Sequence, residues 1–528
     1  MNLNHFGERL VTTAEETAGG AFHLFLGGSA STVLSSVCAI IVARLLGPEQ
    51  YGTYSLALIV SSFLTLFTDY GVSQALTRLI ALHRSRDEMC RVIPLLRAGL
   101  VFSLATCLTI FFIGFIFTDP LTNLLINRSD MTGLVRITLF LLLFYPISAI
   151  AGGALLGFGD MKAYAIIDVV RQIFRLFLSP LLIVLGLGIT GAVAGYVIAF
   201  SAGLALSLAF IYKNYTQIKS SNPKEGSGKA LLPMITYGLP LYLSNTLNSF
   251  VITLRGIILA HYTTNALIGN FQIAMNFAVL ITLVSSPVGT ALFPAFSKLG
   301  SNCSEARTMF KYSVKYSSVL IIPAAVFVSV MSRDLIFLLY GASYTKAPLY
   351  LTIYTLTFLF AALGYTVLGS FFSGVGDPRV NLKATLLYVG IFTPSAITLT
   401  GILQVEGLLI AIIIATAAST LYNLTVAMRK YHLSIDLKSS ACTCLAALSA
   451  AAPIIPLALY SPLPIIGNLA LAALLYIAVY LTLAPLLKVI TKEDLETLTR
   501  IFSKVTLLRP IVYIFSSYER KIIGLMKK

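Results

Sequence analysis

The chain has 528 residues, of which 57% are hydrophobic and only 11% charged, and its mean hydropathy is +0.88. This composition excludes an ordinary water-soluble protein, because a soluble surface needs many more charged side chains. The net charge of +16 does not indicate nucleic-acid binding either, since the lysines and arginines gather in short polar loops and form no basic stripe with exposed aromatic residues.

Apolar runs of roughly 20 residues, each long enough to cross a bilayer, recur along the whole chain. They predict an all-α polytopic membrane protein with about fourteen transmembrane helices. The expected spans are residues 22–46, 50–80, 91–117, 133–157, 162–185, 187–212, 231–260, 264–297, 308–331, 347–374, 378–402, 404–428, 441–461 and 463–489.

Lysine and arginine are concentrated in the loops on one side of the predicted membrane spans. The loops at 83–91, 213–229, 298–315 and 429–438 each contain several lysines or arginines, whereas the loops on the other side contain only Arg128, Arg333 and Lys346. Because cytoplasmic loops carry the excess of Lys and Arg, we expect a multi-pass protein of the cytoplasmic membrane with both termini in the cytoplasm.

Two motifs of the first half recur in the second half, both 217 positions later. Residues 51–57 match residues 268–274, and Gly157-Phe158-Gly159-Asp160 matches Gly374-Val375-Gly376-Asp377. An even number of predicted helices separates equivalent points, so the two halves have the same orientation. This pattern predicts a parallel repeat of two six-helix lobes, followed by two C-terminal helices.

The repeat divides the chain into five expected parts. These are a first lobe at 1–212, a cytoplasmic linker at 213–230, a second lobe at 231–430, two additional transmembrane helices at 431–489 and a cytoplasmic tail at 490–528. Apolar residues at helical spacing predict an amphipathic helix in the tail, which either lies on the cytoplasmic leaflet or packs beneath the bundle.

We expect no cofactor and no metal site. The six cysteines and five histidines are scattered and form no ligand cluster. The glycine-rich stretch at 186–191 lacks a preceding strand, and the one at 226–229 departs from the phosphate-binding loop at Pro223 and Ala230. The predicted outer loops hold almost no catalytic side chains, which argues against an enzyme, with a membrane glycosyltransferase or polymerase as the enzymatic alternative.

The fifth predicted span carries charges far from its ends. Counted from Lys162, Arg175 lies about 20 Å deep, past the middle of a hydrocarbon core of roughly 30 Å. Arg171 lies one turn below it on the same face, and Asp168 precedes Arg171 by three residues. Two guanidinium groups on one face suit an anionic group such as pyrophosphate, which they bind in a bidentate manner. A buried structural ion pair is the alternative interpretation.

Two further ionisable residues lie within predicted spans. Arg255 lies deep in the seventh span, which corresponds to the first span in the repeat, and we expect it either to contact substrate or to serve structure. Asp69 lies in the inner part of the second span without an obvious partner. Asp69 and Asp168 are the candidates for coupling to H⁺ or Na⁺, and a bond to a neighbouring helix is the alternative for Asp69.

The first 80 residues resemble a known family. Residues 43–54, Ala-Arg-Leu-Leu-Gly-Pro-Glu-Gln-Tyr-Gly-Thr-Tyr, look like the first-loop signature of the polysaccharide-biosynthesis flippases, and residues 69–78, Asp-Tyr-Gly-Val-Ser-Gln-Ala-Leu-Thr-Arg, are similar to their second-helix motif. These are the O-antigen-type flippases of the multidrug/oligosaccharidyl-lipid/polysaccharide exporter superfamily. The resemblance implies two six-helix lobes around a cationic cavity, and a lipid-linked oligosaccharide on polyprenyl phosphate as substrate.

The expected function is therefore a flippase that works by alternating access, with Arg171, Arg175 and Arg255 meeting the substrate phosphates. Membrane lipids, and glycosyltransferases or a polymerase of the same pathway, are the partners that this function implies. A cation-coupled multidrug antiporter and a non-transporting scaffold for glycan enzymes are the two alternatives.

Overall fold

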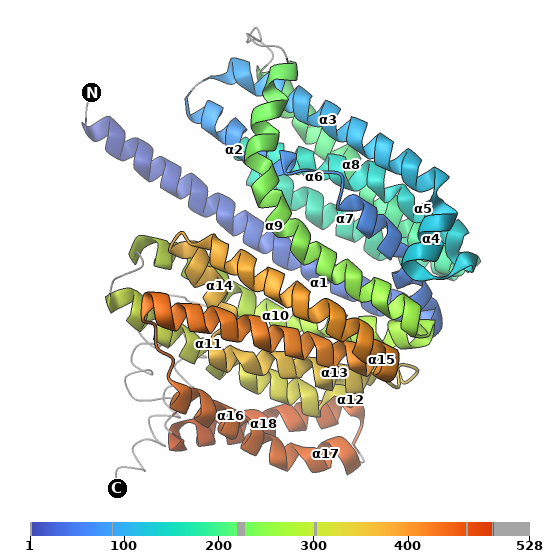
Figure 1. Ribbon diagram of the computed structural model, residues 1–528, viewed down its shortest axis with the longest axis vertical. Coiled ribbons are helices and arrows are strands. Elements are labelled where there is room, and N and C mark those ends of the chain that lie inside the picture. The colour runs from blue at the N-terminus through green and yellow to red at the C-terminus, as the bar shows by residue number, and fades with distance from the viewer. Residues whose placement is uncertain are drawn as a thin grey trace. The chain divides into compact units, whose positions relative to one another are not determined.

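The computed structural model describes residues 3–86, 88–218, 227–299, 304–460, 463–487 and 489. Within these residues the chain is helical and contains no β-strand (Figure 1). It divides into two compact units, Met1–Gly269 and Asn270–Lys528. The predicted tail at 490–528 and residues 219–226 of the predicted linker lie outside the described residues.

The first unit holds a core of buried apolar side chains that come mainly from α2, α3 and α6, with smaller contributions from α7, α8 and α9. The long apolar stretches of these helices explain why they pack together. The helices of this unit are α1 (Leu3–Thr65), α2 (Val72–Ser85), α3 (Met89–Ile116), α4 (Thr118–Ile126), η1 (Ser129–Met131), α5 (Thr132–Leu139), α6 (Leu141–Gly157), α7 (Met161–Leu182), η2 (Ile183–Leu187), α8 (Gly188–Ile218), α9 (Ser227–Tyr262) and the start of α10 (Asn265–Leu299).

The second unit packs around an aromatic cluster that includes Phe310, Phe371, Phe372 and Tyr431, whose rings meet mostly edge to face. Its helices α16, α17 and α18 lie together (Figure 1). After the rest of α10, the elements are α11 (Ser304–Val330), α12 (Ser332–Tyr340), α13 (Ala347–Thr355), η3 (Leu356–Leu363), α14 (Tyr365–Gly374), α15 (Pro378–Tyr431), α16 (Leu437–Ala451), η4 (Ala452–Ile454), α17 (Ile455–Tyr460) and α18 (Ile465–Leu486).

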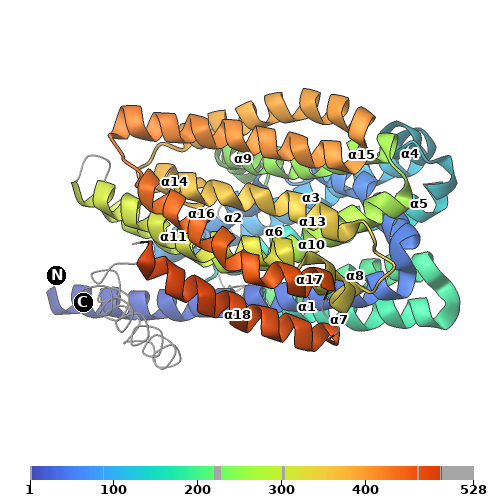
Figure 2. The same cartoon turned by 90° about the horizontal axis from the view of Figure 1, so that it is seen from below.

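By length and composition, eight helices of the described residues are able to cross a membrane, or up to ten if each of two bent pairs forms one span. Three of the eight are about twice as long as a bilayer requires. Their helical backbone is interrupted at Gly47 in α1, at Gly186 between α7 and α8, and at Gln404 in α15. Figure 2 shows the two halves of α15 side by side. The all-α membrane fold is confirmed, and the count of fourteen crossings stays a prediction.

The second predicted span, 50–80, is not one continuous helix. The backbone leaves helical geometry between Thr65 and Val72, and Tyr70 (φ 48°) and Gly71 (φ 81°) both adopt the left-handed region. Carbonyls freed by such a break need partners inside a membrane. The Tyr242 hydroxyl of α9 donates a hydrogen bond to the Leu66 carbonyl and supplies one.

A comparable break interrupts the tenth predicted span. Gly364 (φ 83°) separates η3 from α14, which are bent by 50° relative to one another. The hydroxyl of Ser318 donates to the Ala361 carbonyl at 2.9 Å, and that of Ser440 donates to the Ala362 carbonyl at 3.0 Å. Neighbouring helices thus satisfy the freed backbone groups here too.

Helices α1 and α7 run in the same direction, as two odd-numbered spans should. A side chain at Gly27 would overlap Ala165, and further along both helices the Cys38 thiol donates to the Arg175 carbonyl at 3.6 Å. Small residues on α1 let the two backbones approach closely, which is a common means of packing helices in membranes. This close approach brings α1 against the charged face of α7.

Candidate functional site

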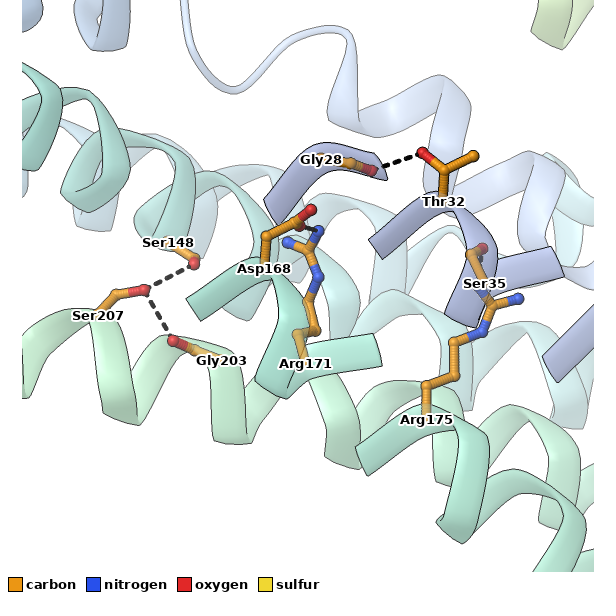
Figure 3. A network of polar contacts seen from close by, with 9 residues as sticks. All are labelled: Gly28, Thr32, Ser35, Ser148, Asp168, Arg171, Arg175, Gly203 and Ser207. Carbon is orange, nitrogen blue, oxygen red and sulfur yellow. Dashed lines mark hydrogen bonds and ion pairs between the residues drawn. The ribbon is translucent and has the colours of Figure 1, made fainter. Parts of the chain in front are cut away.

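The charged residues of α7 lie along one face, as the sequence predicts. Figure 3 shows Arg171 and Arg175 pointing from α7 toward α1, with Asp168 beside Arg171. Arg171 and Asp168 form an ion pair across one turn, and their side chains are 18% and 30% exposed. Two guanidinium groups and one carboxylate leave about one net positive charge, where the surrounding side chains are largely apolar.

Two aromatic rings of α8 cover the guanidinium groups. The Cζ atom of Arg171 lies 4.7 Å from the ring centroid of Phe200, and that of Arg175 lies 4.5 Å from the centroid of Tyr196. The two rings are one turn apart on α8, as the two arginines are on α7, and the two helices pack against each other. Cation–π attraction therefore fixes both planar groups in orientation.

Arg175 contacts both segments of α1. Its Nη1 donates to the Ser35 hydroxyl at 3.3 Å in the segment before the Gly47 break. Tyr54, in the segment after the break, interacts electrostatically with Arg175 and is buried. The guanidinium of Arg175 is thus enclosed by α1, α7 and α8.

Several polar atoms of this region remain without a hydrogen-bond partner in the described part of the chain. They are the Nε atoms of Arg171 and Arg175, the hydroxyl of Ser31 and the Oε1 of Gln172, all of them buried. Leaving such an atom unpaired costs roughly 1–3 kcal/mol, so native proteins rarely do so without a reason. Two unpaired N–H donors on cations are what an anionic ligand would use.

The stem of Arg171 lies over a glycine. A methyl group at Gly203 would lie 3.4 Å from Cδ and 3.5 Å from Cβ and Cγ of Arg171. Beside it, the Ser207 hydroxyl donates to the Gly203 carbonyl at 2.7 Å and lies 3.0 Å from the hydroxyl of Ser148 on α6 (Figure 3). A methyl group at Gly203 would therefore make ordinary van der Waals contact with Arg171, whereas a longer side chain would meet its stem. The serine pair ties α8 to α6.

Tyr145 of α6 connects two predicted site residues. Its side chain is 43% exposed, and its ring centroid lies 5.6 Å from that of Phe200. Both Arg171 and Asp69 interact electrostatically with its hydroxyl.

Asp69 has a partner that the sequence does not reveal. Its two carboxylate oxygens accept hydrogen bonds from the backbone N–H of Ser73 at 3.0 Å and from the Ser73 hydroxyl at 2.7 Å. Asp69 therefore stabilises the start of α2 after the break in the second span. A role of Asp69 or Asp168 in ion coupling stays a prediction.

Arg255 lies on α9, which packs along the second segment of α1. A side chain at Gly256 would meet Ile59, five residues after Tyr54. Gly256 of α9 therefore meets α1 about 7.5 Å along the helix from Tyr54. Contact of Arg255 with substrate stays a prediction.

The aromatic partners of the two arginines were not predicted from the sequence. Tyr196 and Phe200 stand four residues apart in the span that follows Arg171 and Arg175, which are also four apart. In an antiparallel helix pair, equal spacing places such residues opposite one another. This shared spacing of four residues is the sequence pattern from which both cation–π pairs could have been predicted.

Comparison with known proteins decides the family. The family described as "Polysaccharide biosynthesis protein" matches residues 18–300, more than half of the chain. The chain belongs to this family. Within the part of the chain that the structure describes, no group of three or more His, Cys, Asp or Glu is placed to hold a metal ion.

Two relatives of this chain come from Bacillus subtilis and Rhizobium meliloti. Stage V sporulation protein B of Bacillus subtilis (strain 168) is 24% identical over 460 residues, 79% of this chain and 86% of the relative. Succinoglycan biosynthesis transport protein ExoT of Rhizobium meliloti (strain 1021) is 24% identical over 316 residues, 60% of each chain.

Among solved structures, lipid II flippase MurJ in an inward closed conformation has a similar fold. The TM-score is 0.71 at 17% sequence identity, and the match covers 88% of this chain and 98% of MurJ. The fold of this chain is therefore similar to that of MurJ.

Proposed function

We propose that this protein is a flippase that moves an oligosaccharide linked to polyprenyl phosphate from the cytoplasmic to the outer leaflet. The observation that carries the proposal is the pair of guanidinium groups of Arg171 and Arg175, held inside the first unit with unpaired N–H donors. The family, and relatives named as a transport protein and a lipid II flippase, support the glycan as cargo.

A phosphate group matches this pair of guanidinium groups in charge and geometry. Each arginine presents donors in a planar fork, and a guanidinium in a region of low dielectric attracts an anion far more strongly than one in water. Asp168 neutralises part of the charge on Arg171 and leaves Arg175 as the principal positive group. We assign the first phosphate contact to Arg175, with Arg171 and Arg255 as supporting cations.

Transport follows from alternating access around this site. The headgroup enters from the cytoplasm, its phosphates meet the arginines, and the lipid tail stays in the bilayer while the two lobes rearrange. In this scheme both termini are cytoplasmic, residues 1–212 and 231–430 form the lobes, and residues 431–489 add a helix pair. The protein performs transport and no covalent chemistry.

A cation-coupled drug antiporter is less well supported. A cation-coupled antiporter needs carboxylates deep within the membrane that are free to bind a cation or a cationic drug. Here Asp69 accepts two hydrogen bonds from Ser73, and Asp168 is paired with Arg171. The available charge in the region is positive rather than negative.

The test is translocation of a polyprenyl-diphosphate oligosaccharide in proteoliposomes by wild type and by Arg175→Ala. We expect Arg175→Ala to abolish translocation while the protein still inserts. Arg136→Ala is the matched control, because Arg136 is 48% exposed and pairs with Asp119 outside the site, and it should keep wild-type rates. A wild-type rate for Arg175→Ala would remove the assignment of Arg175.

A further inference from the structure

Arg78 of α2 is held in the same way as the two α7 arginines. Its Cζ atom lies 4.1 Å from the ring centroid of Tyr237 on α9, where the corresponding distances are 4.7 Å for Arg171 and 4.5 Å for Arg175. In each case an aromatic ring covers one face of the guanidinium group and fixes its plane. The first unit therefore contains a further oriented guanidinium group, to which the proposed function assigns no role.

The ring of Tyr237 is itself held by close packing of α9. The next residue, Gly238, approaches Gly71 so closely that a side chain on either glycine would overlap the backbone of the other. Gly71 is the residue before α2, and Tyr237 also packs against the buried core of the first unit. These contacts fix the ring beside α2, from which Arg78 reaches it.

The height of Arg78 follows from a contact between α2 and α6. The hydroxyl of the preceding residue, Thr77, donates to the Gly153 carbonyl at 2.8 Å, and Gly153 lies four residues before the end of α6 at Gly157. The backbone of Arg78 therefore lies about 6 Å inside the end of α6, on the side that the charge pattern predicts to be cytoplasmic. Helical side chains point toward the N-terminus of their helix, so the guanidinium of Arg78 reaches further into the membrane.

The two α7 arginines lie deeper than Arg78. Helix α7 begins after the same turn that ends α6, and Arg171 and Arg175 lie about 14 Å and 20 Å beyond Lys162 along it. These guanidinium groups, each held against an aromatic ring, thus lie at increasing depth from the predicted cytoplasmic side. A phosphate that moves from that side toward the α7 arginines passes the level of Arg78 first.

Arg78 is accessible to a ligand. It is classed with the exposed residues of α2, and within the part of the chain that the structure describes it forms no hydrogen bond and no ion pair. The carboxylate of Asp69, which precedes the same helix, accepts its hydrogen bonds from Ser73. Gln74 lies one turn before Arg78 on the same edge of α2, and its amide group can donate to the same anion.

We propose that Arg78 and Gln74 form an entry site for the phosphate groups of the lipid-linked substrate, which bind there before they reach Arg171 and Arg175. The identity of the substrate rests on the proposed function. A guanidinium group binds phosphate oxygens in a bidentate manner, and its orientation by Tyr237 before binding lowers the entropic cost. Such a site divides the movement of a charged group into the membrane into shorter steps, each with a smaller desolvation cost.

Two tryptophan reporters separate the entry site from the α7 arginines, because the chain contains no tryptophan. Tyr237→Trp places a single indole against Arg78, and in a second protein Tyr196→Trp places one against Arg175; we call them the entry reporter and the deep reporter. Tryptophan retains the cation–π contact. Each protein in phosphatidylcholine nanodiscs is mixed rapidly with farnesyl diphosphate, a short water-soluble polyprenyl diphosphate. We expect the fluorescence of both reporters to change.

Substitutions then assign each response. Arg78→Ala should abolish the response of the entry reporter and slow that of the deep reporter about tenfold, without changing its final amplitude, which corresponds to about 1.4 kcal/mol in the barrier. Arg78→Lys should restore part of both, because lysine keeps the charge but not the planar fork. Arg175→Ala should leave the entry reporter responsive. Arg86→Ala removes an exposed arginine at the end of the same helix and is the matched control that should change neither reporter.

The outcomes distinguish the entry site from the proposed function. A deep reporter that responds while the entry reporter stays silent, or that responds equally fast with and without Arg78, would overturn the entry site and leave the proposed function standing. Silence of both reporters would overturn the phosphate assignments of both sites. An equal change of the entry reporter in nanodiscs of phosphatidylglycerol without farnesyl diphosphate would identify bulk lipid as the occupant, and would overturn substrate entry at Arg78.

Discussion

The guanidinium carbon of Arg175 lies 4.5 Å from the ring centroid of Tyr196, so a helix hairpin holds a cation against an aromatic face deep in the first unit. The contact fixes the plane of the guanidinium group. Under the proposed function, this fixed orientation lowers the entropy that Arg175 loses when it binds the substrate phosphate.

Tyr196→Leu tests that orientation. Loss of the ring should slow translocation about five- to thirtyfold, since a desolvated cation–π contact is worth about 1–2 kcal/mol. Tyr196→Phe keeps the ring and should remain close to wild type. Initial rates in proteoliposomes measure the effect, and equal rates for the leucine and phenylalanine variants would contradict it.

Gly203→Leu tests the space below Arg171. A side chain at this position would meet the stem of Arg171 and move its guanidinium away from Phe200 and Asp168. We expect impaired translocation without loss of insertion. Gly467→Leu is the control, because nothing lies within 4 Å of a side chain there. If both variants transport alike, Gly203 has no positioning role.

Gly238→Ala tests the packing of α2 against α9. The backbones at Gly71 and Gly238 are so close that a side chain on either would overlap the other. Overpacking of this kind typically costs about 1–3 kcal/mol, so the melting temperature in detergent should fall. Gly390→Ala lies in open space on α15 and should not lower it. An unchanged melting temperature for Gly238→Ala would show that the crossing adapts easily.

Asp377→Asn tests the turn before α15. The Asp377 carboxylate accepts hydrogen bonds from the Lys430 Nζ at 2.6 Å and the Tyr431 hydroxyl at 2.8 Å, and these bonds lower the pKa of Asp377. A lowered pKa contributes stability above the unfolded value of about 3.9 and loses it as the pH falls through the folded value.

The variant should therefore be less stable than wild type at pH 7, by about 0.5–1 kcal/mol for a partly exposed pair. The difference should shrink as the pH falls below about 4. Thermal unfolding of both proteins across this range measures it, and a difference that is independent of pH would point to the turn rather than to the charge.

Much of the fold could be predicted, because long apolar runs and clustered loop charges are direct consequences of the bilayer. The same holds for the one-turn spacing of Asp168, Arg171 and Arg175, since an α-helix places such residues on one face. Both predictions depend on local sequence alone, the first on the length and charge of consecutive segments and the second on spacing within one helix.

What could not be predicted depends on contacts between helices. The break at Gly71 lies inside an apolar run, and its stability comes from the Tyr242 hydroxyl more than 170 residues away. From the sequence alone, the ring of Tyr196 is interpreted as an ordinary apolar side chain of a membrane helix, because its cation–π partner Arg175 lies on another helix.

We propose that Arg175 recognises the phosphates of a lipid-linked glycan. The decisive experiment compares translocation of a polyprenyl-diphosphate oligosaccharide with that of an uncharged polyprenyl glycoside bearing the same sugars, in wild type and in Arg175→Ala. We expect wild type to prefer the diphosphate strongly and Arg175→Ala to lose this preference. A preference of unchanged size in Arg175→Ala would contradict it.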